Sequence, residues 1–264
     1  MKHLLRDKTG LPFDVFFIAE PIVNPAGKVY AVELLSRFYL AEEQGDLFYP
    51  AEFFLKNATL SDKRSLFVKQ LETLSQNAGF FLENDLLCTL NIDGDLAGII
   101  CSTLDIKNQL MSMPFIRLEI SETFAGLGSS PQHSHLNCLS RDFGLWLDDF
   151  GSGKANLSAI QSCLFDTVKI DRMFFWNMSE KPIWETVIRE IRRYSPSVVV
   201  EGVESEKYRK SLGNSVEGMQ GYPFRPEWWY RCPDNHQQWR ASGCQQWWYG
   251  IRYHGGGGRA FKYR

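Results

Sequence analysis

The sequence predicts an α/β protein, a TIM-like (β/α)8 barrel whose first strand runs antiparallel to the others. About eight short apolar runs of strand length recur along the chain, and most of them alternate with stretches able to form a helix. The first two runs are separated only by Asn24-Pro25-Ala26-Gly27, a turn too short to hold a crossover helix. The first two strands should therefore be antiparallel neighbours.

The expected strands are apolar runs bounded by turn-forming residues. They cover Phe13–Pro21, Lys28–Leu35, Leu86–Ile92, Phe115–Ser121, Gly144–Phe150, Thr167–Ile170, Val198–Val203 and Gly218–Phe224. The expected helices lie between these runs, and the longest has apolar residues at helical spacing. They cover Pro50–Asn84, Leu96–Met111, Ser134–Phe143, Leu157–Cys163, Ile183–Tyr194 and Ser205–Leu212.

The composition narrows the class of protein. The 264 residues are 44% hydrophobic and 23% charged, which is typical of a globular protein with one large domain or two small ones. The 29 Lys and Arg residues against 31 Asp and Glu residues leave no basic excess with which to bind a long nucleic acid. A small ligand stays open as a partner.

The N-terminal region lacks the unbroken apolar stretch of a signal peptide or membrane span, because Asp14 interrupts Phe13–Ile18. The six cysteines are scattered and form no C-x-x-C pair, so they are expected to be reduced thiols rather than disulfides or zinc ligands. These features predict a cytoplasmic protein without a membrane span.

Polar and charged side chains mark nearly every predicted strand end. A (β/α)8 barrel places its chemistry at the carboxyl ends of its strands, so these side chains would meet at one mouth. A single acid there often only marks where a strand leaves the core, and the combination is what favours a site. The side chains are those of Glu33, Asn91, Glu119, Asp148, Asp149, Lys169, Asp171, Glu201, Glu204 and Gln220.

So many carboxylates in one cavity would repel one another unless cations bind there. Carboxylates with one amide, and no His or Cys, favour Mg²⁺ or Mn²⁺ over zinc. The adjacent Asp148 and Asp149 would allow one carboxylate to bridge two ions. Two ions about 3.5–4 Å apart are the usual arrangement for in-line displacement at a phosphodiester.

The segments that carry these residues form an ordered series of seven. They read ELLSRF (33–38), LNID (90–93), LEISE (118–122), LDDFGSG (147–153), VKID (168–171), VEGVE (200–204) and QGY (220–222). The series, spanning roughly 13–226, resembles the EAL-domain family of bacterial phosphodiesterases, and in particular its stand-alone members. The resemblance implies hydrolysis of cyclic di-GMP to linear pGpG with two ions per site, and control of motility and biofilm formation.

The same resemblance implies a role for individual residues. The metal ligands would be Glu33, Asn91, Glu119, Asp148, Asp149 and Glu201. The catalytic residues would be Lys169, which contacts the attacking water, together with Glu201 and Glu33. Arg37 would contact the phosphates of the dinucleotide, and Gln220 would support the cluster beside the substrate. Glu122 and Glu204 would position the loop that follows the fifth strand. Family members often pair, so a homodimer is a further expectation.

Two departures from the family pattern concern substrate and regulation. Glu20 stands in AEPI where the family commonly has YQPI, and a carboxylate can only accept hydrogen bonds from a guanine, whereas an amide can also donate. Substrate affinity is therefore expected to differ. Lys154-Ala155-Asn156 replaces an aromatic-serine-serine run in the loop after the paired aspartates, which leaves the metal ligands intact but changes the regulatory loop.

The C-terminal residues differ from the rest of the sequence. Five of the eight tryptophans lie beyond Pro226, together with two cysteines and the run Gly255–Gly258, without a helical period. We therefore expect an EAL domain over 1–226 and an atypical Trp- and Gly-rich tail over 227–264 that is non-native or disordered. The alternative is a binding appendage, because aromatic and basic residues can stack on bases.

Two other functions stay open at this point. The first is a catalytically weak or inactive EAL domain that acts as a cyclic di-GMP receptor or a protein-binding regulator. Such family members usually lose the signature Glu, the paired Asp or the Lys. This sequence retains all of them, as Glu33, Asp148, Asp149 and Lys169. The second alternative is a barrel hydrolase that acts on another phosphodiester. It would require the resemblance of all seven segments to the EAL family to be coincidental.

Overall fold

The computed structural model describes residues 4–6, 12–40, 47–124, 127, 135–153, 160–161, 164–221 and 224. These residues form two compact units. The barrel unit contains the described residues of Glu20–Glu33 and Asp85–Phe224, and the smaller unit contains those up to Ala19 and those of Leu34–Asn84. The predicted tail over 227–264, the Lys154–Asn156 segment and most of the predicted helix over Leu157–Cys163 lie outside the described residues.

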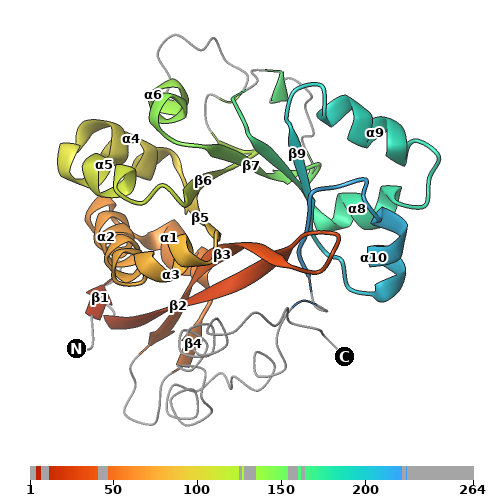
Figure 1. Ribbon diagram of the computed structural model, residues 1–264. Coiled ribbons are helices and arrows are strands. Elements are labelled where there is room, and N and C mark those ends of the chain that lie inside the picture. Colours follow the sequence, from red (N-terminus) through yellow and green to blue (C-terminus); the bar gives the residue numbers. More distant parts are fainter. Residues whose placement is uncertain are drawn as a thin grey trace. The chain divides into compact units, whose positions relative to one another are not determined.

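A closed barrel of mixed strands forms the barrel unit, which confirms the predicted fold class (Figure 1). Strands β3, β5, β6, β7, β8, β9 and β10 pair as parallel neighbours in that order, while β2 pairs with β10 antiparallel and with β3 to close the ring. The strands are β2 (Pro12–Val23), β3 (Val29–Leu40), β5 (Leu87–Ile92), β6 (Ile116–Ser121), β7 (Leu145–Phe150), β8 (Thr167–Ile170), β9 (Ser197–Val200) and β10 (Gly218–Met219). Of β2 and β3, only the residues within Glu20–Glu33 belong to the barrel unit.

The turn between β2 and β3 is the predicted hairpin link. Gly27 adopts φ +81°, a conformation open to glycine, and its N–H donates to the carbonyl of Asn24 over 2.8 Å. The Asn24 side chain accepts from the Lys28 N–H at 2.9 Å. These bonds reverse the chain within a few residues, so β2 lies antiparallel to β3 and to the rest of the barrel.

Buried apolar residues fill the barrel unit. All four residues of β8 are buried, as expected for a parallel strand covered on both faces. Ile22, Ala31, Trp146 and Val199 pack into one cluster although they come from four different strands. The apolar runs that predict the strands are therefore the residues that hold the barrel together.

Helices surround β5–β9 in the barrel unit (Figure 1). They are α4 (Gly94–Ser102), α5 (Leu104–Met111), α6 (His135–Asp142), α8 (Arg172–Met178), α9 (Trp184–Ile191) and α10 (Glu206–Leu212). The helix predicted over Leu96–Met111 is two helices, because Thr103 has an extended backbone between them. Helix α8 was not predicted, and it begins where Asp171 accepts hydrogen bonds from the N–H groups of Met173 and Phe174.

The smaller unit holds β1 (Leu4–Arg6), β4 (Leu47–Tyr49), α1 (Ala51–Asn57), α2 (Leu60–Gln76) and α3 (Ala78–Glu83). The single helix predicted over Pro50–Asn84 was wrong: Ala58 is extended, and Thr59 starts a new helix through a capping box with Asp62. The core of this unit contains Phe38 and Phe54, stacked with ring centroids 4.0 Å apart.

Two further observations bear on the sequence expectations. Cys88, Cys101 and Cys138 are free thiols in the described part of the chain. No helix among the described residues combines the length and the apolar character needed to cross a bilayer.

Candidate metal centre

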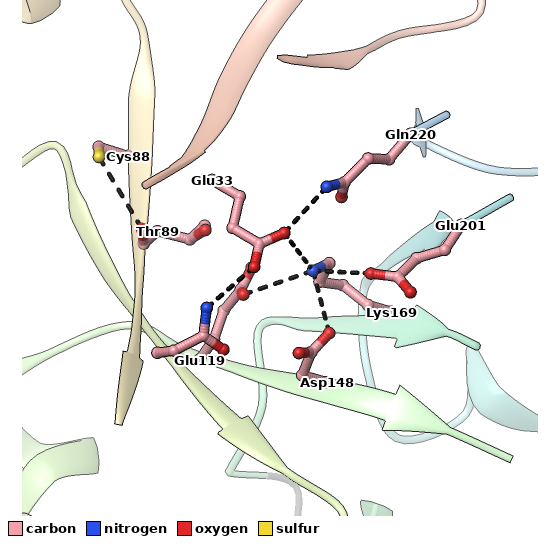
Figure 2. A network of polar contacts seen from close by, with 9 residues as sticks. Glu33, Cys88, Thr89, Glu119, Asp148, Lys169, Glu201 and Gln220 are labelled. Carbon is pink, nitrogen blue, oxygen red and sulfur yellow. Dashed lines mark hydrogen bonds and ion pairs between the residues drawn. The ribbon is translucent and has the colours of Figure 1, made fainter. Parts of the chain in front are cut away.

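The carboxyl ends of the barrel strands bring eight of the predicted site residues together in the barrel unit. Figure 2 labels Glu33, Glu119, Asp148, Lys169, Glu201 and Gln220 among them. Strand pairing produces this arrangement, because Glu119 on β6 lies in register with Asn91 on β5, and Asp148 on β7 lies in register with Ser121. The residues are Glu33, Asn91, Glu119, Asp148, Asp149, Lys169, Glu201 and Gln220.

A single buried ammonium group occupies the middle of the cluster. Lys169 Nζ lies 2.9 Å from Asp148 Oδ1 and 2.9 Å from Glu201 Oε1. The same atom lies 3.1 Å from Glu33 Oε2 and 3.4 Å from Glu119 Oε2. Burial alone would lower the pKa of Lys169, but the surrounding carboxylates raise it well above its ordinary value, so the side chain stays charged.

Glu33 is held by two amide side chains as well as by Lys169. Asn91 Nδ2 donates to its Oε1 over 2.9 Å, and Gln220 Nε2 donates to its Oε2 over 2.9 Å. Burial alone would raise the pKa of Glu33, but Lys169 and these hydrogen bonds outweigh burial and hold the pKa below its ordinary value. Glu33 is therefore a fixed, ionised carboxylate.

Asp148 and Asp149 contribute oxygens to the same cluster although they are neighbours on one strand. Successive side chains of a regular strand point to opposite faces. Here the pairing of β7 with β8 shifts register between Leu147 and Phe150, and Asp149 adopts φ +58°. Aspartate tolerates this left-handed conformation better than most residues. The local irregularity thus turns both carboxylates toward the centre.

Two oxygen clusters result, and Asp148 belongs to both. Oxygens of Glu33, Glu119 and Asp148 lie within 4.8 Å of one another, and so do oxygens of Asp148, Asp149 and Glu201. Oε1 of Glu119 is buried and has no hydrogen-bond partner among the residues that the structure describes. An all-oxygen donor set with an unsatisfied buried oxygen fits hard divalent cations such as Mg²⁺ or Mn²⁺.

Burial raises the pKa of three carboxyl groups in the cluster, because their ionised forms are poorly solvated there. Burial, followed by the charge of Asp148, raises the pKa of Asp149 to about 6. Burial raises the pKa of Glu201 to about 8 although Lys169 opposes the shift, and burial raises the pKa of Glu119 well above its ordinary value. Five carboxylates thus share one ammonium group, and divalent cations would relieve the imbalance.

The two residues predicted to position the loop after β7 differ in their surroundings. Glu122 is buried, and its Oε2 accepts a hydrogen bond of 3.2 Å from the N–H of Gly151 in that loop. Glu204 is exposed and has no hydrogen bond or ion pair with the residues that the structure describes. The loop-positioning role of both residues stays a prediction.

The predicted substrate-binding residues are spread along the chain. Gln220 lies in the cluster through its bond to Glu33, and Glu20 is buried on β2 in the barrel unit. Arg37 lies on β3 in the smaller unit, where its Nη1 donates to the carbonyl of Ser36 over 3.3 Å. The substrate contacts of all three residues stay predictions.

Thr89 of β5 also lies beside the cluster, and Cys88 precedes it on the same strand (Figure 2). Neither residue was assigned to the site from the sequence. Thr89 is in register with Glu33 and stands two residues before Asn91, so the alternation of β5 is the signal that would have placed it on the same face. Burial, with the charges of Glu119 and Glu33, raises the pKa of the Cys88 thiol, which therefore stays protonated.

The fold and the site together define an α/β barrel with two clusters of carboxylate oxygens, each able to hold a metal ion, at the carboxyl ends of its strands. A sequence profile of the EAL domain matches residues 14–226. The chain belongs to the EAL-domain family, which confirms the resemblance seen in the sequence.

Relatives with known roles fall into two groups. The chain is 31% identical over 200 residues to the cyclic di-GMP phosphodiesterase PdeH of Escherichia coli (strain K12), covering 74% of this chain and 76% of PdeH. It is 24% identical over 218 residues to the anti-FlhC(2)FlhD(4) factor YdiV of Salmonella arizonae, covering 81% of this chain and 90% of YdiV. The family thus includes an enzyme and a protein-directed factor.

Solved structures show the same fold. The EAL-like domain protein YdiV superposes with a TM-score of 0.72 at 23% identity, over 79% of this chain and 90% of the YdiV chain. The PaMucR phosphodiesterase in complex with c-di-GMP superposes with a TM-score of 0.59 at 21% identity, over 80% of this chain and 91% of that chain. At these identities, the similarity supports the barrel and does not distinguish the two roles.

Proposed function

We propose that the protein is a metal-dependent phosphodiesterase that hydrolyses cyclic di-GMP to linear pGpG. The observation that carries this proposal is the position of Asp148, which contributes oxygens to both carboxylate clusters while the ammonium of Lys169 lies beside it. A shared carboxylate between two oxygen clusters is the arrangement that hydrolysis of a phosphodiester by two ions requires.

In this proposal, the residues of the cluster form two sets of metal ligands. Glu33, Asn91, Glu119 and Asp148 would hold one Mg²⁺ or Mn²⁺ ion, and Asp148 and Asp149 would hold the second close to Glu201. When bound, such ions would promote deprotonation of the attacking water and neutralise charge on the phosphoryl oxygens. Asn91 already donates to Glu33 and would have to turn its amide oxygen outward to act as a ligand.

Lys169 would stabilise the negative charge that develops during the reaction, and Glu201 would assist proton transfer. Lys169 stays protonated among carboxylates, so its Nζ can donate to the attacking water and to the phosphoryl oxygens as negative charge develops. Glu201 lies 2.9 Å from that ammonium group and would assist proton transfer. Gln220 keeps Glu33 oriented through its hydrogen bond.

The similarity to PdeH supports the enzyme, because that relative is a cyclic di-GMP phosphodiesterase. The second candidate is a weak or inactive EAL domain that binds cyclic di-GMP or a regulatory protein, and the similarity to YdiV favours it. Four carboxylates paired with a buried Lys169 are unnecessary for protein binding alone, which is why we place the enzyme first.

The test is hydrolysis of cyclic di-GMP by the full chain with Mg²⁺ or Mn²⁺, with pGpG measured by chromatography and binding of cyclic di-GMP measured in parallel. We expect pGpG with either metal, and none with EDTA or with Asp148→Asn. Binding of cyclic di-GMP without turnover by a folded sample would favour the receptor. A folded sample with neither property would favour a protein-binding regulator.

Further parts of the proposal concern the cellular setting. We propose that the protein acts in the cytoplasm, where cyclic di-GMP signals, and that it lowers the cyclic di-GMP that controls motility and biofilm formation. A homodimer and a non-native or disordered tail over 227–264 remain parts of the same proposal. Light scattering of the full chain and of a chain ending at Pro226 would test both.

A further inference from the structure

Helix α8 contacts the loops that follow two different site strands. It spans Arg172–Met178 and begins just after Lys169, so it lies between the end of β7 and the end of β9. One loop carries Gly151, two residues after Asp149, and the other carries Gly202, one residue after Glu201. The carboxylates of Asp149 and Glu201 belong to the same oxygen cluster.

The contact with the Gly202 loop is a hydrogen bond supported by close packing. The indole Nε1 of Trp176 donates to the carbonyl of Gly202 over 2.8 Å. Gly202 adopts φ +68°, and a Cβ at this position would lie 2.4 Å from the Cβ of Arg172. A side chain at residue 202 is therefore excluded both by the backbone conformation and by α8.

Neighbouring backbone bonds fix the rest of this loop. The N–H of Glu201 donates to the carbonyl of Ile170 over 3.0 Å, and the N–H of Val203 donates to the carbonyl of Gln220 over 3.1 Å. The Trp176 indole completes a series of three consecutive residues that are each held by a different element, β8, α8 and the end of β10. The carboxylate of Glu201 is thereby attached to a loop with little freedom.

The contact with the Gly151 loop is aromatic. A Cβ at Gly151 would lie 2.5 Å from Cγ of Phe174, and Gly151 adopts φ +98°. The ring of Phe174 also meets Phe150 edge-on, with centroids 6.2 Å apart. From its other side, the N–H of Gly151 is bound by Glu122. Phe174 thus holds the loop that follows the paired aspartates.

We infer that Trp176 and Phe174 are positioning residues that set Asp149 against Glu201 for the second ion of the centre. The inference rests on the proposed two-ion function. The other cluster, of Glu33, Glu119 and Asp148, lies on strands that pair directly and needs no such helix. Helix α8 therefore acts on one ion and not on the other.

The test compares the full-length wild type with Trp176→Phe, which keeps an aromatic ring and removes the indole N–H. Calorimetric titration with Mn²⁺ alone should give two ions in the wild type. In Trp176→Phe, one dissociation constant should rise roughly three- to ten-fold, the value of one lost hydrogen bond, while the other is unchanged. In turnover, the Mn²⁺ concentration for half-maximal rate should rise equally, and excess Mn²⁺ should restore kcat.

Trp184→Phe is the matched control, because Trp184 lies on α9 and packs against Phe175 on α8 without the bond to Gly202. It should bind both ions as the wild type does. If Trp176→Phe loses its folded circular dichroism signal, the second variant is Phe174→Leu, which removes the ring that packs against Gly151. Phe174→Leu should also raise the dissociation constant of the second ion and leave that of the first unchanged.

The outcomes separate this inference from the proposed function. Folded Trp176→Phe that binds both ions with wild-type affinity overturns the role of α8 and leaves the hydrolase standing. A wild type that binds two ions without hydrolysing cyclic di-GMP overturns the hydrolase, while selective weakening in the variant still supports α8. A wild type that binds fewer than two ions overturns the inference.

Discussion

Lys169 Nζ and Asp148 Oδ1 lie 2.9 Å apart, which places the ammonium group against the carboxylate that both oxygen clusters share. The side chain of Lys169 is fully buried, so the attraction is not weakened by solvent as it is at the surface. The ammonium group that stabilises the carboxylate cluster is thus the same group that would stabilise the transition state of the proposed reaction.

Lys169→Met should therefore lower both stability and turnover. Removal of the ammonium leaves buried carboxylates without their partner, which costs about 3–5 kcal/mol of unfolding free energy. Loss of a preorganised charge should lower kcat roughly 10²- to 10³-fold. Denaturant unfolding in EDTA and pGpG formation with Mn²⁺ measure the two effects. Lys207→Met, which removes an exposed pair with Glu180, is the control and should change stability far less, because solvent screens that pair.

Asp148→Asn and Asp149→Asn should differ in the number of ions that they bind. Asp148 contributes to both oxygen clusters, whereas Asp149 contributes only to the cluster that contains Glu201. Calorimetric titration with Mn²⁺ should show both ions weakened by Asp148→Asn and one ion weakened by Asp149→Asn. Turnover should fall in both variants. Equal loss in the two variants would contradict the shared position of Asp148.

The metal-free protein should lose stability as the pH rises from about 4.5 to about 8. The pKa of Glu201 is raised from its ordinary value of 4.5 to about 8, so protonated Glu201 favours the folded state. This contribution is complete below the unfolded pKa and is lost as the pH passes the folded pKa. Asp149, raised from 3.8 to about 6, acts in the same direction over the lower part of this range.

Thermal unfolding in EDTA between pH 5 and pH 9 measures this loss. Mn²⁺ should reduce it, because the ion binds the deprotonated carboxylates, and its binding should release protons. Glu201→Gln in EDTA should flatten the upper part of the profile. A metal-free protein whose unfolding temperature stays constant between pH 5 and pH 8 would contradict the pKa values of this cluster.

Glu20→Gln should change substrate affinity more than chemistry. The amide can donate to as well as accept from a guanine, whereas the carboxylate of Glu20 only accepts. One regained hydrogen bond should lower KM for cyclic di-GMP roughly three- to ten-fold, with kcat changed less than two-fold. Steady-state kinetics at saturating Mn²⁺ measure both constants. An unchanged KM would remove Glu20 from the substrate site.

The barrel could be predicted from sequence because its strands are near-continuous apolar runs with polar residues at their ends. Val168 and Val199 illustrate the first property, and Asn91 and Glu119 the second. Parallel strands in register then bring residues that are far apart in the chain to one mouth. The residues of the candidate site could therefore be predicted from the strand ends alone, without knowledge of the helices.

The helices and the finer geometry were harder to predict. The break at Ala58 depends on the Thr59–Asp62 capping box, which apolar spacing does not reveal. Helix α8 contains several aromatic residues with modest helix propensity, so the sequence did not predict this helix or its contacts with the two loops. The convergence of Asp148 and Asp149 depends on a local change of register, and strand alternation alone would place the pair on opposite faces.

The left-handed backbone at Asp149 limits how this centre can change in evolution. Aspartate, asparagine and glycine accept φ +58° at low cost, whereas branched or bulky residues do not. A change of Asp149 to asparagine would therefore remove one ligand charge while preserving the fold that surrounds it. In the proposed hydrolase, one conservative substitution would thus leave a stable barrel without its second ion, and selection could then keep that barrel for binding alone.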